Sequence, residues 1–198
     1  MEATSHTLLQ QIQAKPGDSW VRLDSIYRPF LYRWLRKQGI EHSDAEDLVQ
    51  EVLMAVAGEL TEFVHSGRPG AFRHWLRTIA VHRAQAFWRA RNVRVRAAGG
   101  TDFQEFLERW QEPDARLREE WDCEHDRHLL QYLLKQVAGE FEAKTMQAFR
   151  RLALEQDPPA QVASELGLSV GAVYIAKSRV LRRLRTLAEG MIDEVQFS

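Results

Sequence analysis

Basic and aromatic side chains are interleaved along residues 72–92, FRHWLRTIAVHRAQAFWRARN. Arginine and histidine can bind backbone phosphates, and an aromatic face can stack on a base that has left the duplex. Phe72, Trp75 and Phe87 recur at helical spacing and are predicted to be core. The expected nucleic-acid contacts lie beside or opposite that face: Arg73, His74, Arg77, Thr78, His82, Arg83, Trp88 and Arg89.

A second basic segment, residues 158–185, has the pattern of a helix-turn-helix. Asp157 is predicted to cap its first helix, with Pro158 at the first helical position. Gly167 stands where a sharp turn needs a positive φ, and Ser169 is placed to cap the second helix. The second helix of such a motif enters the major groove of duplex DNA, so this segment predicts a DNA-binding module.

The second helix of this motif can be divided into faces at about 100° per residue. Its expected core positions are Val173, Ala176, Val180, Leu184 and Leu187. We expect Arg182 to read guanine edges, Ile175 to touch a thymine methyl and Arg183 to hold phosphate. The full set of expected contacts with duplex DNA is Ser169, Gly171, Tyr174, Ile175, Lys177, Ser178, Arg179, Arg182 and Arg183.

Polar and mostly acidic side chains gather on one side of a third predicted helix, residues 43–57. Ser43 and Glu46 have the spacing of a capping box, and an apolar stripe between Ala45 and Val56 is predicted to be buried. The side chains left on the outside are Asp44, Glu46, Asp47, Gln50 and Glu51. Acids near a helix N-terminus match the helix dipole, which is their simplest structural explanation.

Charge is unevenly distributed along the 198-residue chain, although its net charge is only −1. Residues 63–101 contain arginine but no acid, and residues 102–126 are mainly acidic. This alternation predicts two DNA-contacting modules joined by a connector that DNA repels. We expect an all-α protein with an N-terminal helical domain at 1–94, an acidic linker at 95–115 and a helix-turn-helix domain at 116–198.

Helical periodicity also predicts elements between these motifs. The first helix is expected at residues 19–38, kinked or split by Pro29, and a short amphipathic helix is expected at 103–110. Another helix begins near Arg116. No apolar run is long enough to cross a membrane and no signal-peptide pattern is visible, so we expect a cytoplasmic protein without membrane insertion.

Cys123, His125 and His128 do not match the spacing of common metal-binding motifs, so neither a metal nor a cofactor is expected. His125 and Asp126 form the dipeptide that all-α metal phosphohydrolases use, but no convincing set of further ligands accompanies it. An enzyme is therefore the weaker interpretation, and a stoichiometric bound metal would favour it.

Taken together, the motifs resemble a bacterial RNA polymerase sigma factor of the extracytoplasmic-function (ECF) group. The resemblance rests on DAEDLVQEV at 44–52, FRHWLRTIAVHRA at 72–84 and the C-terminal helix-turn-helix, in that order. It implies that the acidic face at 44–51 binds the β′ clamp of core RNA polymerase, and that the helix at 71–92 reads and opens the −10 element of promoter DNA. It also implies −35 reading by the helix-turn-helix and an anti-sigma factor as a partner.

The sequence departs from the family's pattern at two positions of interest. Tyr174-Ile175-Ala176 stands where a Lys-Ser-Arg-like run is common, and His82 stands where asparagine is common. Both departures predict an altered base preference. The alternative interpretation is a stand-alone helix-turn-helix transcriptional regulator with an N-terminal sensing domain, which would bind its operators without the polymerase.

Overall fold

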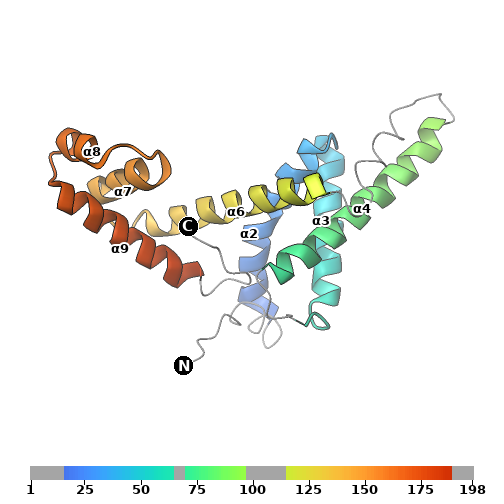
Figure 1. Cartoon of the computed structure of the whole chain (residues 1–198). Coiled ribbons are helices and arrows are strands. Elements are labelled where there is room, and N and C mark those ends of the chain that lie inside the picture. The colour runs from blue at the N-terminus through green and yellow to red at the C-terminus, as the bar shows by residue number, and fades with distance from the viewer. Residues whose placement is uncertain (1–15, 65–69, 97–114, 189–198) are drawn as a thin grey trace. The chain divides into compact units, whose positions relative to one another are not determined.

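The structure is a computed structural model that describes residues 16–64, 70–96 and 115–188, and every element in these ranges is helical (Figure 1). The all-α prediction is confirmed for them, while the helix predicted at 103–110 lies outside the described residues. Contacts divide the chain into a compact N-terminal unit, residues 6–128, and a C-terminal unit whose described part is 129–188. The boundary between the two units therefore falls inside the helix Ala115–Val137 and not before its first residue.

Helix α2 (Pro16–Lys37) supplies much of the core of the N-terminal unit. Its apolar side chains recur at helical spacing, and the fully buried ones include Leu23, Ile26, Phe30 and Trp34. The helix is not divided at Pro29, so the predicted split is wrong. Pro29 and Ser25 are both exposed, and water can therefore satisfy the Ser25 carbonyl that loses its helical donor.

Helices α3 (His42–Glu59) and α4 (Ala71–Arg96) complete this part of the unit, with α3 packed against both α2 and α4. The predicted buried stripe of α3 is confirmed: Ala45, Leu48, Val49, Val52, Leu53 and Val56. Its predicted capping box at Ser43 and Glu46 is wrong. The helix begins at His42, and the N-cap residue Glu41 makes no side-chain capping bond. Its carboxylate accepts a hydrogen bond from Arg91 of α4 at 3.3 Å.

The first half of helix α6 (Ala115–Val137) is packed on α2 and belongs to the same core. Trp121 is fully buried, and its ring meets those of Phe30 and Trp34 edge-to-face with centroids 4.7 Å apart in both pairs. Such aromatic pairs stabilise a core beyond the area that they bury. The sequence predicted a helix starting here but assigned it to the C-terminal domain.

The C-terminal unit contains α7 (Ala143–Phe149), the π-helical turn η1 (Arg150–Leu154), α8 (Pro159–Leu166) and α9 (Val170–Ala188) (Figure 1). Helices α7, α8 and α9 pack on one another. The buried residues that they share are Ala148, Val162, Ala163, Val173 and Ala176. These small and medium side chains let the short helices of a helix-turn-helix approach closely.

The turn between α8 and α9 has the predicted chemistry. Gly167 caps α8 in the left-handed conformation with φ of 63°, and the Ser169 hydroxyl accepts a hydrogen bond from the Ala172 N–H at 3.1 Å. The start of α8 differs from the prediction, because its N-cap is Pro158. Asp157 is not the cap; its carboxylate instead accepts a hydrogen bond from Arg151 Nε at 2.6 Å.

Candidate nucleic-acid interface

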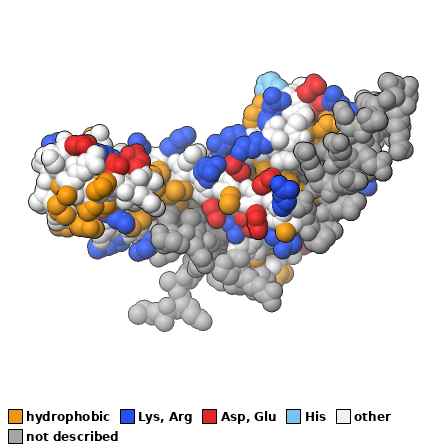
Figure 2. Space-filling model, turned by 45° about the horizontal axis from the view of Figure 1, so that its top comes forward, with side chains coloured by type: hydrophobic (Ala, Val, Ile, Leu, Met, Phe, Trp, Pro, Cys, Tyr) orange, Lys and Arg blue, Asp and Glu red, His pale blue; other side chains and the backbone are white. Residues whose placement is uncertain are grey.

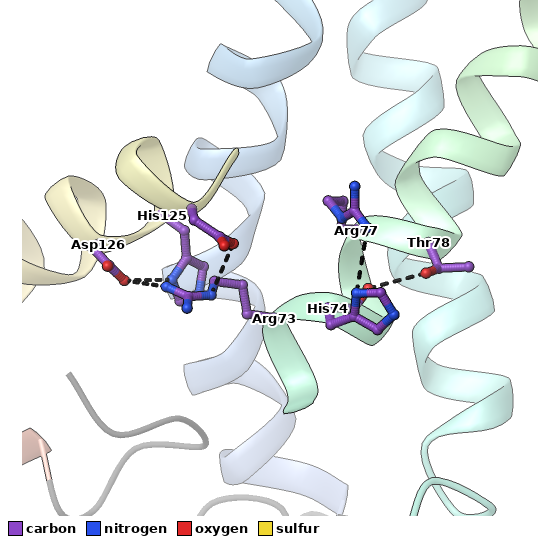
Figure 3. A network of polar contacts seen from close by, with 7 residues as sticks. Arg73, His74, Arg77, Thr78, His125 and Asp126 are labelled. Carbon is purple, nitrogen blue, oxygen red and sulfur yellow. Dashed lines mark hydrogen bonds and ion pairs between the residues drawn. The ribbon is translucent and has the colours of Figure 1, made fainter. Parts of the chain in front are cut away.

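Helix α4 carries the side chains predicted to contact an opened strand, and the structure separates them by exposure. The exposed ones are His74, His82, Arg83 and Arg89, and the partly buried ones are Arg73, Thr78 and Trp88. Arg77 is only 5% exposed, and its guanidinium lies 3.4 Å from Nδ1 of His74 (Figure 3). Arg77 is therefore placed to support the helix surface rather than to form part of it.

Arg73, in the first turn of α4, is held by two carboxylates of α6 (Figure 3). Its Nε lies 3.1 Å from Asp122 Oδ1, and its Nη1 lies 2.6 Å from Asp126 Oδ1. The Arg73 side chain is 22% exposed. A phosphate that bound this guanidinium would have to compete with both acids, because they occupy its donors.

His125 and His128 of α6 are both buried, and His125 contacts Asp126 of this ion pair. His125 is 1% exposed, stacks on Tyr27 and lies 3.4 Å from Asp126 through its Nδ1. Nε2 of His128 donates a hydrogen bond to the Ile26 carbonyl at 2.6 Å, so its Nδ1 is left to accept one from Arg33. Both imidazoles are therefore part of the contact between α6 and α2.

The ionisation of Asp126 is tied to this arrangement. Burial raises the pKa of its carboxyl, but the hydrogen bond from His125 and the charge of Arg73 outweigh burial and leave the pKa below its usual value. The ionised carboxylate thus stabilises the fold at neutral pH. That contribution is lost as pH falls through the lowered pKa, so the contact between Arg73 and Asp126 weakens only in acid.

Arg91 is a structural residue that the sequence analysis did not single out. Its Nη1 donates to Asp44 at 2.7 Å and its Nη2 to Glu41 at 3.3 Å, which joins the end of α4 to the start of α3. Asp44 is 31% exposed through its side chain, so one predicted member of the acidic face already has a partner within the protein. Arg91 and Asp44 are 47 residues apart in the chain, so no local pattern in the sequence predicts that Asp44 has this partner.

The other predicted members of the acidic face, Glu46, Asp47, Gln50 and Glu51, are exposed on α3. A groove between α2 and α3 runs beside them and is lined by Arg28, Pro29, Tyr32, His42, Glu46, Asp47, Val49 and Gln50. The Tyr32 hydroxyl and His42 Nδ1 form a hydrogen bond of 2.7 Å in this groove. Sequence reasoning missed Arg28, Tyr32 and His42 because it is the packing of α2 on α3 that forms this groove, and no local pattern predicts that packing.

Helix α9 presents its predicted face to solvent. Gly171, Tyr174, Ile175, Ser178, Arg179 and Arg182 are exposed, and Lys177 and Arg183 are partly buried. The expected core is confirmed at Val173, Ala176, Val180 and Leu184, whereas the last buried position is Ala188 rather than Leu187. The helix therefore has one side available for a duplex.

Two of the cations on α9 also contact the segment that precedes α7. Nε of Arg183 donates to Glu140 at 2.6 Å and its Nη2 at 2.8 Å, and this bidentate pair lowers the pKa of Glu140. The Arg179 guanidinium lies 5.9 Å from the centre of the Phe141 ring, within range of a cation–π contact. These contacts fix the positions of the Arg179 and Arg183 side chains on the surface of α9.

A third arginine fixes the turn that leads into the helix-turn-helix. Arg151 donates to Asp157 at 2.6 Å and to Glu165 at 2.5 Å, and its side chain is 16% exposed. It therefore joins η1, the following turn and α8. We expect it to position α8 rather than to contact DNA, because both of its partners are carboxylates of its own unit.

The model of the family Sigma-70 region 2 matches residues 23–94, which comprise most of α2 together with α3 and α4. The chain therefore contains a Sigma-70 region 2 domain. This domain is a part of sigma factors, which act in transcription initiation, so the sequence resemblance is confirmed for residues 23–94. The match ends before α8 and α9, so a second DNA-binding module there stays a prediction.

A solved structure described as an RsbN–BldN complex is also similar to this chain. It has 19% sequence identity, covers 90% of this chain and 98% of its own, and superposes with a TM-score of 0.33. That likeness is too low to support any inference about function. No curated protein matches the sequence.

Neither a membrane span nor a metal centre is found in the part of the chain that the structure describes. None of the described helices is long and apolar enough to cross a membrane. Among residues 16–64, 70–96 and 115–188, no three His, Cys, Asp or Glu side chains are grouped so that they could hold a metal ion. Cys123 is an exposed free thiol.

Proposed function

We propose that this chain is a sigma factor of the ECF type: it binds core RNA polymerase reversibly, directs it to a subset of promoters and helps to open the −10 region. The observation that carries this proposal is a Sigma-70 region 2 match followed, in the same chain, by a helix-turn-helix whose second helix has an exposed cationic side. The two modules suit two parts of one promoter. The region 2 module offers aromatic and basic groups to an opened strand, and the helix-turn-helix offers a helix that fits the major groove of duplex DNA.

The acidic face of α3 is the proposed contact with the β′ clamp of the polymerase. Its exposed members are Glu46, Asp47, Gln50 and Glu51, and the groove beside them adds Arg28 and Tyr32. Asp44 contributes less, because Arg91 already occupies its carboxylate. A charged, exposed face of this kind favours a partner of opposite charge and speeds association with it.

Helix α4 is the proposed reader of the opened −10 strand. His82, Arg83 and Arg89 are exposed, and Trp88 is partly exposed beside them in sequence. Flipping a base out of the duplex costs a few kcal/mol, which stacking and phosphate contacts must offset. Arg73 joins this surface only if its carboxylate partners on α6 release it.

A double substitution tests this competition: Asp122→Asn with Asp126→Asn. We expect affinity for a single-stranded −10 oligonucleotide, measured by fluorescence anisotropy, to rise about three- to tenfold, because Arg73 gains freedom to bind phosphate. The dependence of log K on log salt should also steepen by about 0.7 for the added contact. The matched control is Glu119→Gln with Glu120→Gln, which removes the same charge from exposed positions of α6. Equal gains in affinity in both double variants would contradict a competition between the α6 carboxylates and phosphate for Arg73.

Helix α9 is the proposed reader of the −35 element in duplex form. Arg182 is exposed on its outer side, and Arg183 is held by Glu140. We expect Arg182→Ala to lower discrimination between −35 sequences by about 1–3 kcal/mol, because a bidentate contact with guanine is lost. Exposed Arg185→Ala is the control and should weaken binding to all sequences alike. Competition binding with promoter variants measures both; an equal loss on every sequence would assign Arg182 to phosphate.

The proposal includes a partner that covers the basic surfaces when the protein is not bound to polymerase, an anti-sigma factor. The exposed cations on α4 and α9 support it, because free cationic surfaces bind nucleic acid nonspecifically unless they are covered.

Run-off transcription with purified core polymerase and a promoter library tests the proposed function. We expect transcripts from a defined subset of promoters only when the full chain is added. Tight, sequence-specific binding to duplex DNA without polymerase would instead support the stand-alone regulator, and the absence of promoter-dependent transcripts would reject the sigma-factor role proposed for these surfaces.

A further inference from the structure

Helix α9 is divided along its length into an uncharged first part and a cationic second part. Residues 170–176, VGAVYIA, contain no charged side chain, and the basic residues begin at Lys177. The residues of a recognition helix that contact base edges lie in its N-terminal part. In this helix, that part lacks the Arg, Lys, Asn and Gln side chains that form bidentate hydrogen bonds with bases.

Large apolar side chains are exposed in this uncharged part. Val170 is 42% exposed, Tyr174 53% and Ile175 61%. Figure 2 shows apolar side chains gathered on the surface of the C-terminal unit. Val170, Tyr174 and Ile175 are not residual core, because the inward side of the same turns is closed by Val173, 0% exposed, and Ala176, 6% exposed. An exposed apolar cluster of this kind indicates a contact surface.

The surroundings of the cluster favour duplex DNA as the occupant. Every charged residue of α9 is basic, and Arg179 and Arg185 are exposed further along the helix than the cluster. Phosphates would match these two cations and hold the first two turns in the groove. Gly171 adds room on the same side, since a Cβ there would meet only the Ser169 hydroxyl, at 3.9 Å.

One feature of a base edge in the major groove is apolar: the C5 methyl group of thymine. We propose that Val170, Tyr174 and Ile175 form an apolar reading surface that selects −35 elements by their thymine methyl groups. This inference rests on the proposed function of α9 and adds the base class that it recognises. Ile175, the most exposed of the three, contributes the largest apolar contact.

The test removes only the methyl groups. The full chain and core polymerase first select a −35 element from a randomised promoter library, and each thymine in it is then replaced by deoxyuridine. We expect affinity to fall about fourfold for each methyl that contacts the surface, the loss that corresponds to one buried methyl-sized group. Ile175→Ala should abolish the difference between thymine and deoxyuridine at one position. Leu154→Ala, which removes an exposed apolar side chain outside α9, should leave it unchanged.

Two results would overturn the inference. Selected −35 elements that bind equally with thymine and deoxyuridine at every position, while promoter-specific initiation persists, would reject methyl reading and leave the proposed function standing. If the polymerase and the chain select no promoter even with unmodified thymine, the proposed function fails and the inference falls with it.

Discussion

Replacing Asp47 and Glu51 with lysine is expected to abolish binding to core RNA polymerase and to leave the fold intact. Both side chains are exposed on α3, and no ion pair of either is found among the described residues. Both lie beyond the first turn, so the helix dipole is little affected. Like charges brought together at an interface cost several kcal/mol, which corresponds to a loss of at least about 100-fold in affinity.

The control for this variant is Glu59→Lys, a reversal of an exposed acid at the other end of the same helix. It should bind polymerase almost as the parent chain does. Biolayer interferometry with immobilised core enzyme measures affinity, and circular dichroism with thermal melting checks the fold. Unchanged affinity of the double variant, with a normal fold, would remove α3 as the docking surface.

Replacing Trp121 with alanine is expected to cause the largest loss of stability in the N-terminal unit. The side chain is fully buried between the rings of Phe30 and Trp34. Removing a buried tryptophan costs about 3–5 kcal/mol, a large part of the roughly 5–15 kcal/mol that stabilises a typical domain. Because Trp121 joins α6 to α2, residues 115–128 should also lose protection against hydrogen exchange.

Urea unfolding and hydrogen-exchange mass spectrometry measure these two effects. Cys123→Ala, an exposed neighbour on the same helix, should change the unfolding free energy by less than about 0.5 kcal/mol. A Trp121→Ala variant that unfolds at the parent urea concentration would mean that the first half of α6 is not part of this core.

Local signals account for what the sequence predicted correctly. The turn at Gly167 and the cap at Ser169 each depend on neighbours within a few residues, so residue type and spacing suffice. The buried stripe of α3 follows from its period. By the same local logic Pro29 was expected to kink or split its helix; the helix is not split there, because an exposed proline can remain within a helix that packing stabilises.

Contacts between distant parts of the chain account for what was missed. Arg73 lies 53 residues from Asp126, and no pattern in either segment predicts that they meet. The acids of residues 102–126 suggested a linker that DNA repels, yet two of the described ones, Asp122 and Asp126, bind the helix expected to read DNA. The same limit applies to Arg91 and Asp44. Charge counts along the sequence predict a charged surface, but ion pairs between distant residues decide which of those charges remain available on it.

The division of α9 into an apolar and a cationic part separates two thermodynamic responses. Contact through Tyr174 and Ile175 would contribute a negative heat-capacity change and little dependence on counterions. Contact through Arg179 and Arg182 would release counterions and contribute almost no heat-capacity change. If α9 binds duplex DNA, temperature and salt should therefore act on different ends of the same helix.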